Sequence, residues 1–362
     1  ALLADDDPDN DLTPTQAQKV FMWQTRKQPK YDQPDYDIDA GFGGPVPFAE
    51  KLGNLRFFTT YRKHREMLIV PLSRDDYKDY DWTLKLTSDL SPSMKLMITG
   101  LTGKQYTMQQ NTNPNYLRRH DDIAYQLRGS PRNLYYLCGT GGHSITDIGH
   151  NSISAKLTHQ LSSTSFYDVS IEYFKRDYFS RPIRDRNPDK VYEILPGYFV
   201  DESPFGYDNT AGNGIDQDMP FGGFSSMQRD NTTASSTTIK FDYSNQFNFN
   251  NLFKGGIEFV YNDIDFDYGV SDYFSNTSYR SKIKYQASPI RAAIYIQDKL
   301  EAEGFIMNVG LRLDYSNPNT DWVNPDAWDR RFFSSNYEGD EGYEVTKAKS
   351  QYQLSPRLGI AH

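Results

Sequence analysis

The sequence is poor in three things. It contains a single cysteine, Cys138, among 362 residues, so no disulfide can form within the chain. Hydrophobic residues make up only 37% of it and the mean hydropathy is −0.74, and it has no run of about 18 apolar residues, so a membrane-spanning helix is excluded. The formal net charge is −9 and the pI is near 5.2. This acidic balance argues against nucleic-acid binding, which usually requires a basic face.

Catalytic signatures are also missing. No Ser-His-Asp set and no pair of carboxylates has the sequence context that such chemistry needs. The segment Gly139-Thr140-Gly141-Gly142 lacks the Lys-Ser/Thr of a phosphate-binding loop. A lone cysteine without a paired catalytic pattern is more often inert than nucleophilic. We therefore expect no catalytic residue, no cofactor and no enzymatic activity.

Two groups of residues could in principle hold a metal ion. His143 and His150 flank Asp147, but they lack the i, i+4 spacing of a helical zinc site. The acidic start of the chain lacks the glycine and the terminal glutamate of an EF-hand loop; its carboxylates are Asp5, Asp6, Asp7, Asp9 and Asp11. Solvated loops explain both groups, and we expect no metal site.

What the chain does have is apolar residues at every second position. In the segment 305–315, Phe305, Met307, Val309, Leu311, Leu313 and Tyr315 alternate with polar or small residues that include Arg312 and Asp314. Such alternation predicts a strand with two different faces. Similar segments lie at 36–43, 55–62, 80–86, 94–98, 153–161, 166–176, 237–247, 255–263, 290–299 and 354–361.

The connections between these eleven segments alternate between short and long. They run roughly 10, 17, 3, 49, 4, 60, 7, 26, 4 and 38 residues, with boundary errors of about two to four residues. Tight turns on one rim and long loops on the other are typical of a membrane-spanning antiparallel barrel. We therefore predict an all-β fold, an antiparallel transmembrane β-barrel with short periplasmic turns and long extracellular loops.

Aromatic residues make up 15% of the chain, with 27 Tyr, 22 Phe and 4 Trp. Barrels place such residues in girdles at the two membrane interfaces. They could also be cross-strand pairs in a sheet or part of the core of a β-sandwich. The candidates for the girdles are Phe166, Tyr173, Phe241, Tyr243, Phe259, Tyr261, Phe305 and Tyr315.

Three passages resemble a known family. PDYDIDAGFGGPVPF (34–48), followed by LRFFTTYRKHREMLIVPLSRDDY (55–77) and LKLTSDLSPSMKL (84–96), resembles the early barrel of large TonB-dependent outer-membrane receptors. The likeness is greatest to the group with a carboxypeptidase-regulatory-like N-terminal domain. AAIYIQDKLEAEGFIMNVGLRLDYSNP (292–318) looks like that family's mid-barrel hairpin, and LSPRLGIAH (354–362) is similar to the strand that follows.

The resemblance implies a 22-stranded barrel closed around an N-terminal plug in the outer membrane of a Gram-negative bacterium. It also implies energised import of a nutrient such as a siderophore, glycan or peptide. This sequence shows no plug, no TonB box and no second half of the barrel. We therefore expect residues 1–362 to be a partial barrel domain of about eleven strands, with residues 1–35 in an outer loop and 36–362 in strands and loops.

The resemblance also implies partners and site residues. The partners are outer-membrane lipid, the TonB energy-coupling complex acting through absent N-terminal parts, the receptor's own missing plug and remaining strands, and an unknown small or oligomeric ligand. The long loops at 102–150, 177–236 and 316–353 would select that ligand; candidate contacts are Tyr135, Tyr136, Phe205, Tyr207 and Trp322. Polar residues of the strands would face the lumen, namely Lys85, Asp168, Glu172, Arg176, Arg291, Arg312 and Asp314. Solvation alone would also explain their polarity.

Two other functions stay open. One is a passive or structural outer-membrane barrel, such as a pore or an adhesin. The other is a soluble all-β glycan-binding module.

Overall fold

The computed structural model describes most of the chain. The described ranges are 34–67, 73–109, 144–181, 191–195, 198–201, 214–215, 219–220, 228–270, 282–323 and 345–361, together with residues 13–15, 18 and 328. Of the predicted site residues, Tyr135, Tyr136, Phe205 and Tyr207 lie outside these ranges, as do Cys138, His143 and nearly all of the segment 1–35.

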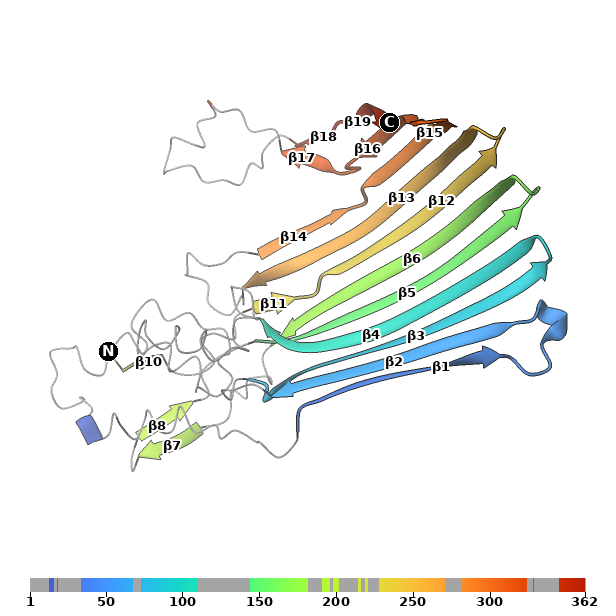
Figure 1. The fold of residues 1–362 in the computed structure, drawn as a ribbon. Coiled ribbons are helices and arrows are strands. Elements are labelled where there is room, and N and C mark those ends of the chain that lie inside the picture. The colour runs from blue at the N-terminus through green and yellow to red at the C-terminus, as the bar shows by residue number, and fades with distance from the viewer. Residues whose placement is uncertain are drawn as a thin grey trace.

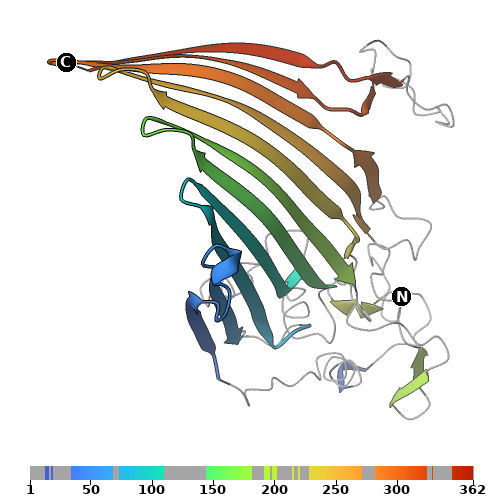
Figure 2. The same cartoon turned by 90° about the vertical axis from the view of Figure 1, so that its right-hand side faces the viewer.

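One curved, 13-stranded antiparallel sheet forms the body of the protein (Figures 1 and 2). Its strands follow the chain order, and each inner strand pairs with its neighbours in that order, apart from the two interrupted strands described next. The strands are β1 (Tyr36–Pro45), β2 (Arg56–Met67), β3 (Asp76–Ser91), β4 (Met94–Gln109), β5 (Ser144–Gln160), β6 (Ser165–Arg181), β11 (Gln228–Asp230), β12 (Thr233–Gln246), β13 (Asn251–Val270), β14 (Lys282–Ala287), β15 (Ile290–Ala302), β16 (Phe305–Asn317) and β19 (Gln351–Ala361).

Two of these strands continue a neighbour after a short break. β14 and β15 pair with successive parts of β13, and the break between them falls at Ser288-Pro289, because proline has no N–H to donate to the ladder. β11 and β12 likewise pair with successive parts of β13.

The remaining elements are small. The 3-10 helix η2 (Glu50–Leu52) lies in the connection between β1 and β2. Three short hairpins lie outside the main sheet: β7 (Val191–Leu195) with β8 (Tyr198–Asp201), β9 (Gly214–Ile215) with β10 (Met219–Pro220), and β17 (Asp321–Val323) with β18 (Val345–Lys347). Among the described residues, no helix is long and apolar enough to cross a membrane.

Short and long connections lie at opposite rims of the sheet (Figure 1). The turns at 92–93, 161–164, 247–250 and 303–304 share one rim with the η2 connection. The connections 68–75, 110–143, 182–227, 271–281 and 318–350 leave from the other rim. We call these the short-turn rim and the long-connection rim. The sorting of connections that the sequence predicts is therefore confirmed.

All eleven predicted segments are strands, but several strands are longer than the alternation indicated. β4 continues to Gln109 and β5 begins at Ser144, so both ends of the predicted loop 102–150 belong to the sheet. β6 similarly continues to Arg181. These extensions carry charged or polar side chains on both faces, so they lack the apolar alternation by which a strand is recognised in sequence.

The register of the sheet gives it two distinct faces. Partners in adjacent strands point to the same side, so each row of paired residues belongs to one face. One row runs Leu86–Ile98–Ala155–Ile171–Ile239–Phe259–Ala292–Tyr315. We call the side that carries this row the apolar face and the opposite side the polar face.

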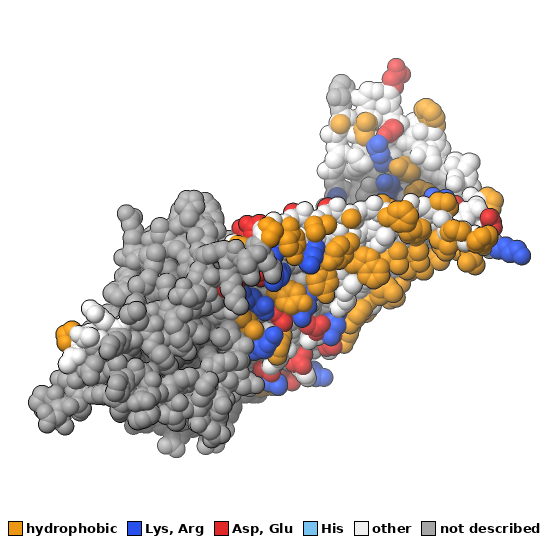
Figure 3. All heavy atoms as spheres, turned by 90° about the horizontal axis from the view of Figure 1, so that it is seen from below, with side chains coloured by type: hydrophobic (Ala, Val, Ile, Leu, Met, Phe, Trp, Pro, Cys, Tyr) orange, Lys and Arg blue, Asp and Glu red, His pale blue; other side chains and the backbone are white. Residues whose placement is uncertain are grey.

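The apolar face is exposed. Ile257, Ile294 and Ile296 expose 52%, 51% and 53% of their surface, although residues of this type normally seek burial. Figure 3 shows these hydrophobic side chains gathered in a band along the sheet. A contiguous apolar surface of this size requires a nonpolar environment or a partner.

Most of the predicted girdle residues lie on the apolar face. Phe166 is an exception, because it precedes Asp168 by two positions and shares the polar face with it. Phe241 and Phe259 pair with Ile257 and Ala292 inside the apolar band rather than at its border. The prediction that these three residues form a girdle is therefore wrong. The pattern within one strand does not show how far along the strand direction its residues lie relative to those of the neighbouring strands.

Candidate functional site

The polar face is the surface on which the candidate site is built. One row of paired residues crosses most of it, running Lys85–Thr99–Ser154–Glu172–Thr238–Val260–Arg291–Ser316. A parallel row runs Thr158–Asp168–Asp242–Gly256–Tyr295–Arg312. Asp314 and Arg176 belong to neighbouring rows of the same face. The structure thus places all seven residues predicted as lumen-facing on one side of the sheet.

These polar side chains interact across neighbouring strands. The Lys156 ammonium lies 3.0 Å from the Asp168 carboxylate, and the Thr158 hydroxyl donates a 2.6 Å hydrogen bond to the same group. Arg312 lies 2.8 Å from Asp314 in its own strand and 3.8 Å from Glu258, two strands away. The charges of opposite sign are therefore interspersed rather than separated into patches.

Two contacts on the polar face cross an intervening strand directly above a glycine. The Tyr295 hydroxyl in β15 donates a hydrogen bond to Asp242 in β12, above Gly256 of the intervening β13. A Cβ added to Gly256 would lie 2.6 Å from the Tyr295 ring and 2.8 Å from the Asp242 carboxylate. Any side chain at this position would therefore displace the pair.

The second contact of this kind joins β3 to β5. Nε2 of His150 lies 2.7 Å from the Asp81 carboxylate, and Gly103 of β4 lies between them. A Cβ at Gly103 would lie 2.5 Å from that His150 nitrogen. On the concave side of a curved sheet the side chains of neighbouring strands converge, so they can reach across an intervening strand. The polar face is thus the concave face.

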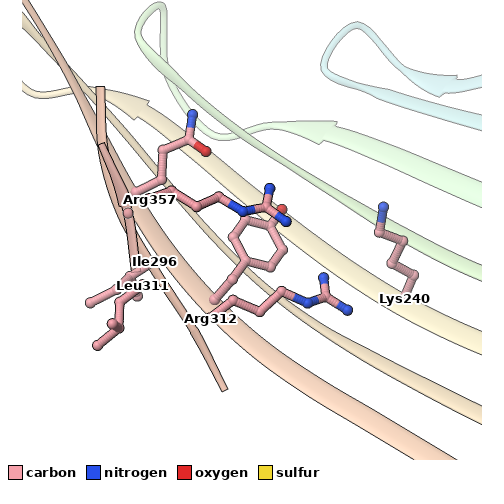
Figure 4. Close-up of a pocket in the computed structure, with 8 residues that line it drawn as sticks. Lys240, Ile296, Leu311, Arg312 and Arg357 are labelled. Atoms are coloured by element: carbon pink, nitrogen blue, oxygen red, sulfur yellow. The ribbon is translucent and has the colours of Figure 1, made fainter. Parts of the chain in front are cut away.

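A shallow cavity of about 190 Å³ opens on the polar face near the end of the strand order (Figure 4). Its polar lining comes from Lys240, Tyr295, Gln297, Arg312 and Arg357. Figure 4 shows the side chains of Arg312 and Arg357 on one side of the strands and those of Ile296 and Leu311 on the other.

The cations of this cavity differ in their pairing. Lys240 lies 3.5 Å from Asp242, and Arg312 is paired as described above. Arg357 is exposed and has no ion-pair partner among the described residues. A guanidinium with five free donors beside an amide and a second guanidinium can bind a carboxylate or another oxyanion.

Only one of the five predicted ligand-contact residues, Trp322, lies among the described residues. Trp322 lies in β17, beyond the long-connection rim, and exposes 67% of its surface. The other four, Tyr135, Tyr136, Phe205 and Tyr207, lie outside the described residues and stay predictions. Trp322 is available for stacking against a ligand.

Two of the three residues considered as a histidine metal site lie among the described residues, and the structure separates them. His150 pairs with Gly103 on the polar face, whereas Asp147 pairs with Tyr106 on the opposite face. Residues three positions apart in a strand point to opposite sides. No group of three metal-ligating side chains occurs among the described residues.

Asp147 instead binds cations. Its carboxylate lies 2.5 Å from Arg74, 3.2 Å from Arg181 and 3.5 Å from Lys104. Arg74 lies in the connection before β3, where burial lowers the pKa of its guanidinium and the Asp147 carboxylate opposes that shift. The alternation of apolar residues did not reveal this cluster, because it lies in the extensions of β4, β5 and β6. An aromatic residue followed two positions later by a basic one, as in Phe179–Arg181, is the signal that could have found the extension of β6.

No family model and no curated protein matches the sequence. Solved structures do match its fold. FpvA of P. aeruginosa, solved with bound pyoverdines, aligns over 92% of this chain and 40% of its own, with 10% identity and a TM-score of 0.52. The fold is that of part of a TonB-dependent receptor barrel.

Other solved structures of the TonB-dependent receptor fold also match. The FrpB iron transporter of Neisseria meningitidis aligns over 90% of this chain and 44% of its own, with 13% identity and a TM-score of 0.49. The alcaligin receptor FauA of Bordetella pertussis aligns over 92% and 41%, with 12% identity and a TM-score of 0.49. The chain therefore spans less than half the length of these proteins.

We predict that Gly256→Ala lowers the stability of the protein, because its methyl group would displace Tyr295 and Asp242. The expected loss is about 1–3 kcal/mol, which urea titration of the barrel would measure. Gly100→Ala is the matched control, since nothing lies within 4 Å of the Cβ position there. In a Tyr295→Ala background, which removes the ring that the methyl group would meet, the Gly256→Ala penalty should shrink. Equal penalties at Gly100 and Gly256 would disprove the role of the glycine.

Proposed function

We propose that this chain is part of the wall of an outer-membrane TonB-dependent receptor that takes up a nutrient. The observation that carries the proposal is the two-faced sheet, with an exposed apolar convex face and a polar concave face. Lipid on one side and a wet lumen on the other would satisfy both faces. The long connections would then lie outside the cell and the short turns in the periplasm.

The backbone at the ends of the sheet supports a larger closed barrel. Among the described residues, β1 and β19 are the end strands of the order, and each has one partner. In lipid, unpaired N–H and C=O groups cost several kcal/mol each. Further strands, a plug and the segment that engages TonB would accordingly be supplied by other parts of the receptor, with residues 1–35 in an outer loop.

The ligand would enter from the long-connection rim. Trp322 and the predicted contacts in the long connections would meet it first, and the seven polar-face residues would line its path or hold the plug. FpvA was solved as a complex with pyoverdine and iron. By analogy, this supports a metal chelate among the candidate ligand classes, beside glycans and peptides.

A passive or structural barrel would have the same wall. What separates the two functions is energy coupling, because import through a plugged barrel requires TonB whereas diffusion through a pore does not.

The face assignment makes a prediction at two adjacent positions. Leu311 lies on the apolar face with 41% of its surface exposed, and Arg312 lies on the polar face. Leu311→Arg should destabilise the membrane-inserted protein by about 2–4 kcal/mol, because an arginine side chain in mid-membrane is poorly solvated. Arg312→Leu should be much milder. The measurement is the fraction of heat-modifiable, folded protein in outer membranes, and similar losses for both variants would show that the faces are misassigned.

Uptake by the full-length receptor should depend on energy. Cells that express it would be offered radiolabelled ferric chelates, oligosaccharides and peptides, with and without a protonophore. We expect one class to accumulate, and accumulation to stop with the protonophore or when TonB is deleted. Trp322→Ala should reduce binding of that ligand, with the barrel still assembled. Accumulation that persists without the proton gradient would favour the passive pore.

A further inference from the structure

The apolar face carries a belt of cations at one end only. The belt comprises Lys63, Arg65, Lys78, Lys104, Lys175 and Arg181 of strands β2–β6, with Arg74 of the connection before β3. Register places the strand residues on the apolar face: Lys63 joins Lys104 through Tyr80, and Lys78 joins Asp147 through Tyr106. Figure 3 shows Lys and Arg side chains at the border of the hydrophobic band.

The belt begins where the apolar residues end. Along β2, Phe57 and Tyr61 are followed by Lys63 on the same face, and along β3, Leu84 and Trp82 are followed by Tyr80 and Lys78. On β6, Ile171 and Tyr173 lead to Lys175. Strands β3 and β6 thus pass from aliphatic to aromatic to cationic side chains toward the long-connection rim, and β2 passes from aromatic to cationic side chains. Aromatic rings at such a border mark the boundary between hydrocarbon and headgroups.

The opposite end of the same face has no such belt. In the described strands of the main sheet, the apolar face near the short-turn rim holds residues such as Met94, His159, Tyr167 and Leu300, and no Lys or Arg. The basic residues of that end, including Lys95 and Lys156, pair with polar-face partners. The cations are therefore arranged for one leaflet only.

Three carboxylates hold the belt in place without neutralising it, and one of them, Asp177, lies 2.9 Å from Lys175. Asp76 lies 2.6 Å from Arg65 and 3.0 Å from Lys78, and Asp147 binds Arg74, Arg181 and Lys104. Arg65 stabilises the belt rather than presenting a charge to the surroundings. Only 3% of its surface is exposed, and it also donates a 2.7 Å hydrogen bond to the Pro34 carbonyl. Cations outnumber carboxylates, so an anion is still attracted.

Aromatic rings fix the directions of several cations. The Lys104 ammonium lies 4.8 Å from the centre of the Tyr106 ring, the Arg181 guanidinium 4.7 Å from that of Phe179, and the Lys63 ammonium 5.5 Å from that of Tyr36. Cation–π contacts hold a charge in place while leaving its other donors free. The side chains of Lys104, Lys78 and Arg181 remain 36%, 43% and 37% exposed.

We infer that the belt binds the phosphate groups of an outer-leaflet lipid whose acyl chains lie against the apolar band. This inference rests on the proposed placement of the sheet in an outer membrane. Clustered Lys and Arg bind phosphate oxygens through charge-assisted hydrogen bonds. The adjacent hydrocarbon surface selects a lipid over free phosphate, since only a lipid satisfies both parts of the site.

The test measures binding of lipid A, a doubly phosphorylated glycolipid, to the full-length receptor in phosphatidylcholine nanodiscs. Binding should be lost with dephosphorylated lipid A and should resist an excess of inorganic phosphate. Removing a cation next to anionic lipid costs about fivefold in affinity, so Lys63→Gln with Lys104→Gln should weaken binding about 25-fold. Lys63→Arg with Lys104→Arg should retain it.

The matched control removes two cations from the polar face, Lys85→Gln with Lys156→Gln, and should leave lipid binding unchanged. Three results would overturn the inference: equal loss in the control, equal binding of dephosphorylated lipid A, or displacement by inorganic phosphate. Heat-modifiable migration of every variant is recorded alongside. A receptor that assembles but shows no phosphate preference refutes the lipid site alone, whereas a wild-type receptor that never inserts into membranes refutes the proposed function as well.

Discussion

Backbone hydrogen bonding between consecutive antiparallel strands is the constraint on which the rest of this structure depends. It ties each residue of an inner strand to partners on both sides and so assigns its side chain to one face. A slip of one residue in any strand would bring charges such as Arg312 into the apolar band and Leu311 onto the polar face. The hydrophobic pattern and the register therefore support each other across the whole sheet, from β1 to β19.

The two faces use that constraint differently. On the concave polar face, glycines at 103 and 256 let side chains from alternate strands meet, as the Asp81–His150 and Asp242–Tyr295 pairs do. These contacts link strands that share no backbone hydrogen bonds, so they brace the curvature of the sheet. On the convex face side chains diverge, and contacts with the surroundings take the place of contacts within the protein. Among the described strands of the main sheet, Lys and Arg appear on that face only toward the long-connection rim, as in the belt around Asp76 and Asp147.

The sequence alone predicted the fold class, the two rims and the strands, because period-two alternation reports directly on a sheet with one apolar side. It also predicted which polar residues share a face, including Lys85 and Arg312. It missed what depends on neighbours in other strands: the roles of Gly103 and Gly256, the exposed Arg357 and the Asp147 cluster. It erred at Phe166 and at the lengths of β4 and β5, because alternation fades where both faces become polar. The ligand itself leaves no comparable signature in the described residues.

The proposed function makes this sheet a membrane wall with lipid on its apolar face. Fluorescence quenching along β16 tests it most directly. Single cysteines from 305 to 317, introduced into a Cys138→Ser receptor and labelled with a polarity-sensitive probe, would be exposed in turn to brominated lipids and to iodide. We expect brominated lipid to quench the probe at positions 311 and 313, and iodide to quench it at positions 312 and 314, so that the quencher alternates residue by residue. Uniform quenching by iodide along the strand would contradict it.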